Sequence, residues 1–311
     1  MSDTGPLPAL VPPVQRPKKR DVHGWLILDK PVNETSTHAV AVVKRVFHAR
    51  KAGHAGTLDP LASGLLPVAF GEATKTVPFV QDGEKAYRFT VKWGVETDTD
   101  DSEGRNTRES DDRPTRAAIE ALLPRFIGEI QQTPPQFSAI KIAGERAYDL
   151  AREGEQVELK ARTVTIYTLE IVDSNENETQ FFMECGKGAY VRAIARDLGR
   201  LLGCFGHVTA LRRTRVGPFT EEDAYTLDEI ENQNMAGEAL LSVEAGLTEL
   251  PCVIVDRDTA ARLRRGGSVI LRGRDAPSGG VVYAACGGVP VAFGEIVEGA
   301  LTPSRVFNLP L

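Results

Sequence analysis

The sequence is poor in the residues that most often bind metals. It has 4 cysteines and 5 histidines in 311 residues, and no two cysteines form a C-x-x-C pair. This spacing argues against a zinc site and against a disulfide framework. The histidines show no metal-ligand pattern either. We therefore expect neither a metal site nor a cofactor.

Long hydrophobic runs are also missing. No apolar run approaches the length that a membrane span needs. The N-terminus has no apolar segment of the kind found in secretory signals. We expect no contact with a membrane and a cytoplasmic location.

An excess of basic charge is lacking as well, since the net charge is -6. A negative total at first argues against a nucleic-acid partner, but phosphates respond to local patches rather than to the sum. Much of the acid lies in Glu96–Asp112, which we expect to be a solvated loop. Basic residues cluster at Arg16–Arg20, Lys44–Lys51, Arg212–Arg215 and Arg257–Arg274. Each cluster alone is typical of a solvated surface, but together they allow binding of a polyanion.

The composition divides the chain into three parts. Residues 1–22 are proline-rich, then basic and without periodicity, which is typical of a disordered tail. Residues 23–250 carry helical and strand patterns of a packed domain. After Pro251, short apolar segments alternate with glycines, which predicts a small β-barrel-like domain over residues 251–311.

Several segments have clear patterns. Apolar and alternating segments predict strands at Trp25–Leu28, Tyr87–Trp93 and Thr179–Cys185. Cap residues and helical periodicity predict helices that begin near Ser36 or Thr37 and at Thr115–Leu123 and Ala189–Leu202.

One carboxylate, Asp59, stands in an otherwise apolar and glycine-rich run from His54 to Lys75. Because it precedes Pro60, it is restricted to an extended or turn conformation. Leucines on both sides would wall it, and rigid loops of this kind often carry catalytic groups. The alternative is that Asp59 only caps a short helix that begins at Pro60.

Three further positions have competing interpretations. Tyr87 is either a core aromatic at the end of its strand or a side chain that meets a ligand. Gly186-Lys187-Gly188 faintly suggests a phosphate loop, but the rest of that motif is absent, so we reject nucleotide binding there. Arg192 lies at the start of a predicted helix, where the helix dipole is positive. It is either an exposed surface arginine or, as we favour, one whose charge is compensated by a nearby carboxylate such as Asp59.

Longer stretches resemble one known family. G-H-A-G-T-L-D-P-L-A-S-G-L-L-P at Gly53–Pro67, preceded by L-D-K-P at Leu28–Pro31, closely resembles the central motif of the TruB family of tRNA pseudouridine synthases. The stretch that begins P-P-Q-F-S-A-I-K at Pro134 and C-G-K-G-A-Y-V-R-A-I-A-R-D-L-G at Cys185–Gly199 resemble the second and third motifs. G-H-V-T-A-L-R-R-T-R at Gly206–Arg215 completes the match, which covers about residues 23 to 250.

The resemblance implies an α+β fold with a mixed, mainly antiparallel sheet flanked by helices. A-A-R-L-R-R-G-G-S-V from Ala260 resembles the start of a PUA-type RNA-binding domain, which implies a small β-rich domain at the C-terminus. The expected reaction is isomerisation of the T-loop uridine at tRNA position 55 to pseudouridine. The expected partner is the tRNA T-arm stem-loop, with no protein partner and a monomeric enzyme.

The resemblance also assigns roles to individual residues. Asp59 is the expected nucleophile, with Tyr87 against the target base and Arg192 paired with Asp59. The other positions implied near the substrate are His54, Tyr190 and Leu211, with Lys30 and Pro31 as structural support. The arginines after Leu211 suit a phosphate backbone.

The residues leave the chemical step open between attack on C1′, attack on C6 and removal of the 2′ proton. Two other functions would need different features. An RNA-binding module would not need Asp59 with Arg192, and a carboxylate glycosidase would need a second positioned acid, which the motif stretches do not offer.

Overall fold

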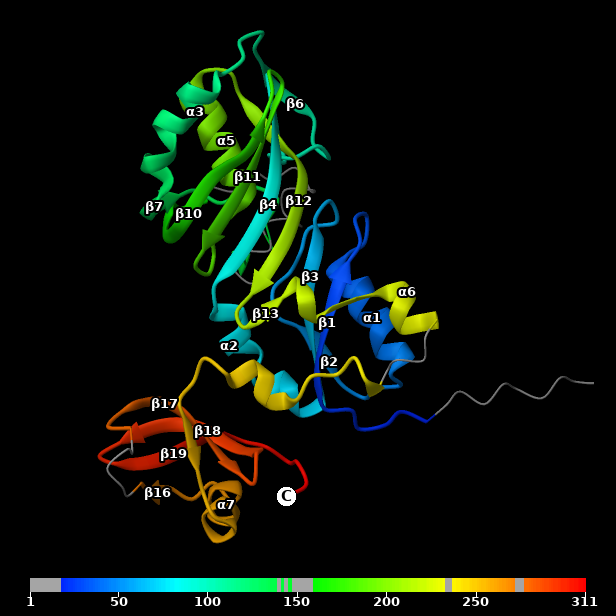
Figure 1. Cartoon of the computed structure of the whole chain (residues 1–311), viewed down its shortest axis with the longest axis vertical. Helices are drawn as coiled ribbons and strands as arrows, with labels where there is room; N and C mark the ends of the chain where they lie inside the picture. Colours follow the sequence, from blue (N-terminus) through cyan, green and yellow to red (C-terminus); the bar gives the residue numbers. More distant parts are fainter. Residues whose placement is uncertain (1–17, 139–140, 143–144, 147–158, 233–236, 272–276) are drawn as a thin grey trace, which may run out of the picture.

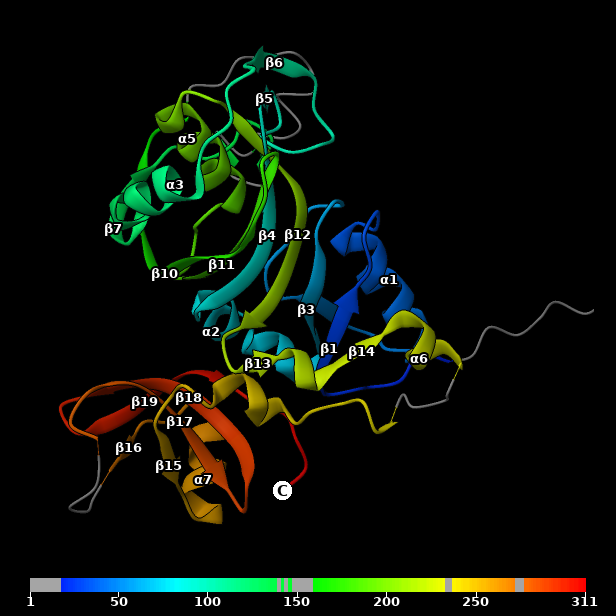
Figure 2. The same cartoon turned by 45° about the horizontal axis from the view of Figure 1, so that its top comes forward.

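The computed structural model describes residues 18–138, 141–142, 145–146, 159–232, 237–271 and 277–311. These residues form one large and one small β-sheet with helices (Figures 1 and 2). Within this part of the chain, no helix has the length and apolar character needed to cross a membrane. Arg20, which we placed in the N-terminal tail, donates from Nε to the Phe47 carbonyl at 3.0 Å, so this end of the tail is anchored.

The large sheet is mixed but mainly antiparallel, as predicted. Its main order is β14-β1-β3-β12-β4-β11-β10-β7, with β2 beside β3 and β13 beside β12. Only the β1–β14 and β3–β12 pairs are parallel. The strands are β1 (Gly24–Lys30), β2 (Ala52–His54), β3 (Ser63–Phe70), β4 (Lys85–Trp93), β7 (Gly128–Gln132), β10 (Arg162–Ser174), β11 (Glu178–Cys185), β12 (Gly206–Val216), β13 (Phe219–Thr220) and β14 (Ala224–Thr226).

The helices lie in two groups beside this sheet. Figure 1 shows α3 and α5 beside β10 and β11, and α1 and α6 beside β1. Their bounds are α1 (Ser36–Val46), α2 (Val77–Asp82), α3 (Arg116–Leu122), α5 (Val191–Leu202) and α6 (Leu227–Asn232). Short 3-10 segments are η1 (Gly71–Lys75), η2 (Leu123–Phe126), η3 (Glu221–Asp223) and η5 (Val243–Leu247).

Two predicted helix starts shift slightly. Thr35, not Ser36 or Thr37, caps α1, because its side chain accepts from the His38 amide. Ser36 is buried instead, and its hydroxyl both donates to the Leu58 carbonyl and accepts from the Leu58 amide, each at 2.9 Å. The start of α1 is therefore tied to the loop that holds Asp59. The other shift is in α5, which begins at Val191 rather than Ala189.

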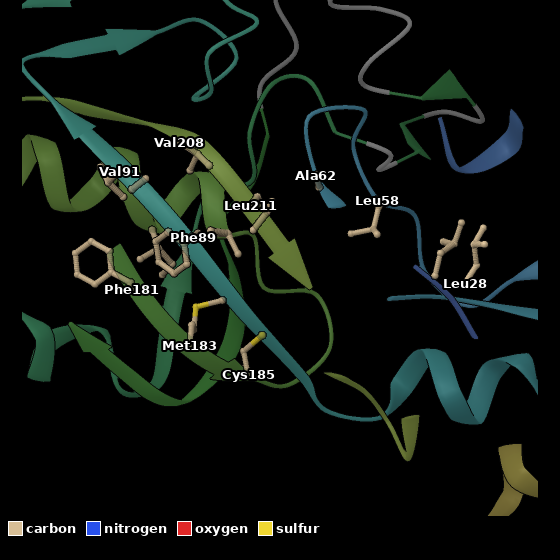
Figure 3. Packing of buried hydrophobic residues seen from close by; sticks show 14 of the residues in the cluster. Leu28, Leu58, Ala62, Phe89, Val91, Phe181, Met183, Cys185, Val208 and Leu211 are labelled. Atoms are coloured by element: carbon tan, nitrogen blue, oxygen red, sulfur yellow. The ribbon is translucent and has the colours of Figure 1, made fainter. Parts of the chain in front are cut away.

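The predicted strand at Tyr87–Trp93 is confirmed as β4, and one of its faces belongs to the main hydrophobic core. Phe89, Val91 and Trp93 are buried, while Arg88 and Lys92 face away. Figure 3 shows Phe89 and Val91 with side chains from β11 and β12. The rings of Phe89 and Phe181 stack at 5.2 Å between centroids. This packing fixes β4 beside β12, where the candidate site begins.

The acidic segment is only in part the solvated loop that we expected. Most of it forms the hairpin of β5 (Val95–Thr97) and β6 (Asn106–Glu109), and its acids Asp98, Glu103, Glu109, Asp111 and Asp112 are exposed. Glu96, Asp100 and Asp101 are buried. Each of these acids pairs with an arginine of α5. The pairs are Glu96 with Arg200 (2.7 Å), Asp100 with Arg196 (3.1 Å) and Asp101 with Arg192 (3.3 Å). Arginines four residues apart share one helix face, so the acids bind α5 rather than water.

The C-terminal region forms a second, five-stranded sheet with one helix. Its order is β15-β17-β18-β19-β16. The elements are β15 (Cys252–Ile254), α7 (Arg257–Arg264), β16 (Val269–Ile270), β17 (Gly280–Cys286), β18 (Val289–Val297) and β19 (Ala300–Val306). The last strand, β19, was not predicted.

This small sheet packs directly on the large one. Strand β1 is buried on both faces: Leu26 and Leu28 join the main core, and Trp25 and Ile27 join a second cluster. That second cluster includes Phe293 of β18. The ring of Phe293 packs edge to face against that of Phe79 of α2, with 4.9 Å between the ring centroids. The two sheets therefore share a hydrophobic core.

The shared core predicts a stability effect. Phe293→Ala should lower the free energy of unfolding by about 3–5 kcal/mol, because a buried ring is replaced by a cavity. Val297→Ala on the same strand is the control. Its side chain is 54% exposed, so the change should stay within about 0.5 kcal/mol. Urea unfolding followed by circular dichroism measures both, and equal effects would contradict the shared core.

Candidate active site

A cavity of about 590 Å³ opens where β4, β12, the start of α5 and the Asp59 loop meet. Its volume lies in the usual range for small-ligand sites, about 300–1,000 Å³. The expected site residues Asp59, Tyr87, Tyr190, Arg192 and Leu211 all line it. His54 is not among the lining residues; it ends β2 and pairs with Val68 of β3.

Asp59 lies in an irregular turn between β2 and β3. The Ala62 amide donates to the Asp59 carbonyl at 3.0 Å, and the chain then enters β3 at Ser63. No helix begins at Pro60, so the interpretation of Asp59 as a helix cap is wrong. The reason is length: the chain has only three residues between Asp59 and β3.

Lys30 and Pro31 lie beneath this turn. Lys30 is fully buried, and its Nζ donates to the carbonyls of Pro31 and Glu34, each at 2.7 Å. The Pro60 carbonyl is 3.5 Å away. Desolvation lowers the pKa of Lys30 to about 8, against the pull of Glu34 and Asp59. Both residues therefore lie where support for the Asp59 turn is needed.

Arg192 binds Asp59 in the ion pair that we predicted. Its Nη2 lies 2.9 Å from Asp59 Oδ2, and its Nη1 lies 3.3 Å from Asp101 Oδ2. It also donates to the carbonyls of Thr99 and Phe137, at 2.9 and 2.8 Å. Its side chain is only 4% exposed, whereas that of Asp59 is 37% exposed. The buried cation thus holds a carboxylate that still faces the cavity.

An aromatic and apolar wall faces Asp59. Tyr87 of β4 and Leu211 of β12 contribute side chains to it. Desolvation raises the pKa of Tyr87 to about 12, so its hydroxyl keeps its proton at neutral pH. Tyr190 precedes α5, and the Arg162 guanidinium lies 5.1 Å from the centre of its ring.

The sequence did not place Lys85, Arg162 or Arg213 at this cavity, although all three line it. Lys85 donates to the carbonyls of Gln81 and Gly83, and desolvation lowers its pKa to about 8. Arg213 is 2% exposed and lies at the cavity wall. The sequence could have indicated Arg213, because it lies two residues after Leu211, and residues two apart in a strand share one face.

We expected the arginines after Leu211 to contact phosphates, but in the structure they are held by groups of the protein itself. Arg212 binds both oxygens of Asp29, at 2.9 and 2.8 Å, and Glu221 at 2.6 Å. Arg213 is buried, and Arg215 pairs with Glu84 at 2.7 Å. The pattern identified a basic cluster but not the carboxylates that neighbouring strands bring to it.

Searches for similar proteins agree on one family. Residues 44–191 match the model of the TruB family pseudouridylate synthase N-terminal domain, and residues 192–258 match the tRNA pseudouridylate synthase B C-terminal domain. The tRNA pseudouridine synthase B of Rhodopseudomonas palustris is 59% identical over 304 residues, covering 94% of this chain and 83% of that protein. That of Bradyrhizobium diazoefficiens is also 59% identical over 304 residues, covering 94% and 88%.

Solved structures agree on the fold. A Cbf5–Nop10–Gar1 complex contains a chain with a TM-score of 0.71 and 27% identity, over 92% of this chain and 84% of that one. A chain of an H/ACA RNP bound to a substrate RNA containing 2′-deoxyuridine has a TM-score of 0.72 at 24% identity, over 93% and 86%. With relatives this similar over almost its whole length, the chain belongs to the TruB family of pseudouridine synthases and is an isomerase.

Proposed function

We propose that this protein is a cytoplasmic, monomeric tRNA pseudouridine synthase that isomerises the T-loop uridine at position 55. Asp59 is the nucleophile. The observation that carries the proposal is the ion pair between buried Arg192 and Asp59 at the wall of the cavity. The family relationship supports the same reaction, since the named relatives are tRNA pseudouridine synthases.

The reaction breaks the N1–C1′ bond of the uridine, rotates the freed uracil and joins C5 to C1′, with loss of the C5 proton and gain of one at N1. It changes no oxidation state of the substrate as a whole. Its first need is an ionised carboxylate. The Arg192 guanidinium pairs with the Asp59 carboxylate at 2.9 Å. An ionised carboxylate is needed whether Asp59 attacks C1′, attacks C6 or removes the 2′ proton.

The second need is a pocket for a base that has left its stack. Tyr87 and Leu211 offer the aromatic and apolar walls, and Tyr190 stands at the substrate side. His54 lies outside the cavity lining and helps to place the displaced nucleotide.

The third need is a site that binds the RNA away from the reacting base. We assign residues 23–250 to the catalytic domain and 251–311 to a PUA-like RNA-binding domain. Helix α7 carries Arg257 and Arg262, and Arg265 caps its C-terminus; all three are exposed. Exposed arginines on one short helix suit a phosphate backbone.

A glycosidase function has less support. Retaining and inverting enzymes both need a second carboxyl group across the scissile bond. The other acid that lines the cavity is Asp82, and it is ion-paired with Lys187 at 2.9 Å. An RNA-binding module without catalysis would have no need for the buried Arg192 that holds Asp59.

Asp59→Asn should abolish isomerisation and leave tRNA binding nearly intact, because the amide keeps the shape and removes the nucleophilic charge. Tritium release from tRNA labelled at uridine C5 measures the reaction, and filter binding measures affinity. Asp82→Asn is the control and should keep its activity. Near wild-type activity of Asp59→Asn would remove Asp59 from the mechanism, and loss of activity in Asp82→Asn would favour a two-acid reaction.

Tyr87→Phe should lower kcat far more than affinity. The ring retains its stacking on the base, which contributes about 1–3 kcal/mol, but the hydroxyl is gone. Single-turnover tritium release and tRNA titration separate the two quantities. If Phe is as active as Tyr, the hydroxyl has no chemical task.

Arg262→Ala combined with Arg265→Ala should weaken tRNA binding and leave kcat at saturating tRNA unchanged. Each lost phosphate contact should reduce the log–log salt slope of binding by about 0.7–0.9. Arg116→Ala on α3, which removes an exposed arginine paired with Glu120, is the control. An unchanged slope in the double variant would show that α7 does not bind RNA.

A further inference from the structure

Arg213 is a buried cation to which the proposed reaction assigns no task. The phosphate contact that the sequence suggested for it does not fit a side chain that is buried. Arg213 lies near the middle of the large sheet, on β12 between β3 and β4. Its backbone pairs with Gly64 on one side and with Tyr87 on the other. Burial of a charge is costly unless the charge is well paired. Desolvation indeed lowers the pKa of Arg213.

The guanidinium binds both limbs of the loop that carries Asp59. Its Nη2 donates to the Gly56 carbonyl at 3.0 Å, before Asp59, and its Nε donates to the Leu65 carbonyl at 2.8 Å, after it. The Thr57 carbonyl lies 3.5 Å from Nη1. A planar group with donors in fixed directions can hold two chain segments at a set separation.

Space around the guanidinium is tight on the loop side. Gly56 has φ of +98°, and a Cβ there would lie 3.3 Å from Arg213 Nη1. By contrast, a Cβ at Gly53 would meet nothing within 4 Å. The loop therefore rests directly on the arginine.

Tyr87 lies beside Arg213 on the neighbouring strand. The two residues are paired across β4 and β12, and both line the cavity together with Asp59. The charged and titratable groups that act on the pKa of Tyr87 are Arg213, Cys185 and Asp59.

We propose that Arg213 is a positioning residue of the active site, which sets Asp59 against Tyr87 by binding the backbone on both sides of the Asp59 turn. The inference rests on the proposed function and adds a residue to it. Arg213 touches no substrate in this scheme. It acts only through Asp59 and Tyr87.

Arg213→Lys tests the proposal, since lysine keeps the positive charge but lacks the planar guanidinium group with its several donors. The rate of the chemical step at saturating tRNA should fall about 100-fold, the usual cost of a misplacement near 1 Å, with tRNA affinity unchanged. Arg200→Lys is the matched control: it removes a guanidinium fork that binds Glu96, away from the Asp59 loop, and should leave the rate unchanged. Thermal melts establish that each variant is folded.

The combination with Tyr87→Phe separates positioning from general support. If Arg213 acts by setting Asp59 against Tyr87, Arg213→Lys should slow Tyr87→Phe much less than it slows the wild type, because both changes then disturb the same arrangement of Asp59 and Tyr87. Effects that multiply independently would overturn the part of the proposal that concerns Tyr87.

Gly56→Ala keeps the test open if Arg213→Lys does not fold. It presses on the guanidinium from the loop and should lower the chemical rate but not affinity. Gly128→Ala is the control, because Gly128 has a similar φ of +90° but no atom within 4 Å of the added Cβ, and it should change neither. A wild-type rate in Arg213→Lys, or in Gly56→Ala if only that variant folds, overturns the proposal while the proposed function stands. If wild-type protein releases no tritium from tRNA, the proposed function fails and the inference fails with it.

Discussion

The ion pair between Arg192 and Asp59 depends on several parts of the chain that are distant in sequence. Arg192 is brought by α5, Asp59 by the turn after β2, and Asp101 by the hairpin of β5 and β6. Each contribution alone would be unfavourable, because a cation at the N-terminus of a helix and two carboxylates near an apolar wall all resist burial. Together they compensate one another. The sheet has to close around β12 before any of these charges finds its partner.

The same principle explains the unusual number of buried ions around the cavity. Lys30, Arg192 and Arg213 are all buried, and each donates to backbone carbonyls near Asp59 or its partners. Apolar residues of equal size could pack these positions with less desolvation. They could not bind carbonyl oxygens in irregular backbone, however. The buried cations therefore replace the regular hydrogen bonding that a turn between strands lacks.

The sequence predicted the local features well. Alternation located β4, apolar content located β1 and β11, and motif resemblance identified the fold and brought Asp59, Tyr87, Arg192 and Leu211 to one place. What it missed depends on long-range pairing. The acids of the hairpin looked solvated because their arginines lie about a hundred residues later, on α5. Arg212 and Arg215 looked free because Asp29, Glu221 and Glu84 come from other strands or loops. The interpretation of Asp59 as a cap failed because local spacing does not reveal where the next strand begins.

The core shared by the two sheets has a geometric consequence. Since Trp25 and Ile27 of β1 and Phe293 of β18 belong to one cluster, α7 stands at a fixed distance and angle from the cavity. In an RNA that contacts both α7 and the cavity, the distance from the bound backbone to the reacting base must equal the distance from α7 to the cavity. Under the proposed function, the fixed spacing between α7 and the cavity would select RNA by its shape.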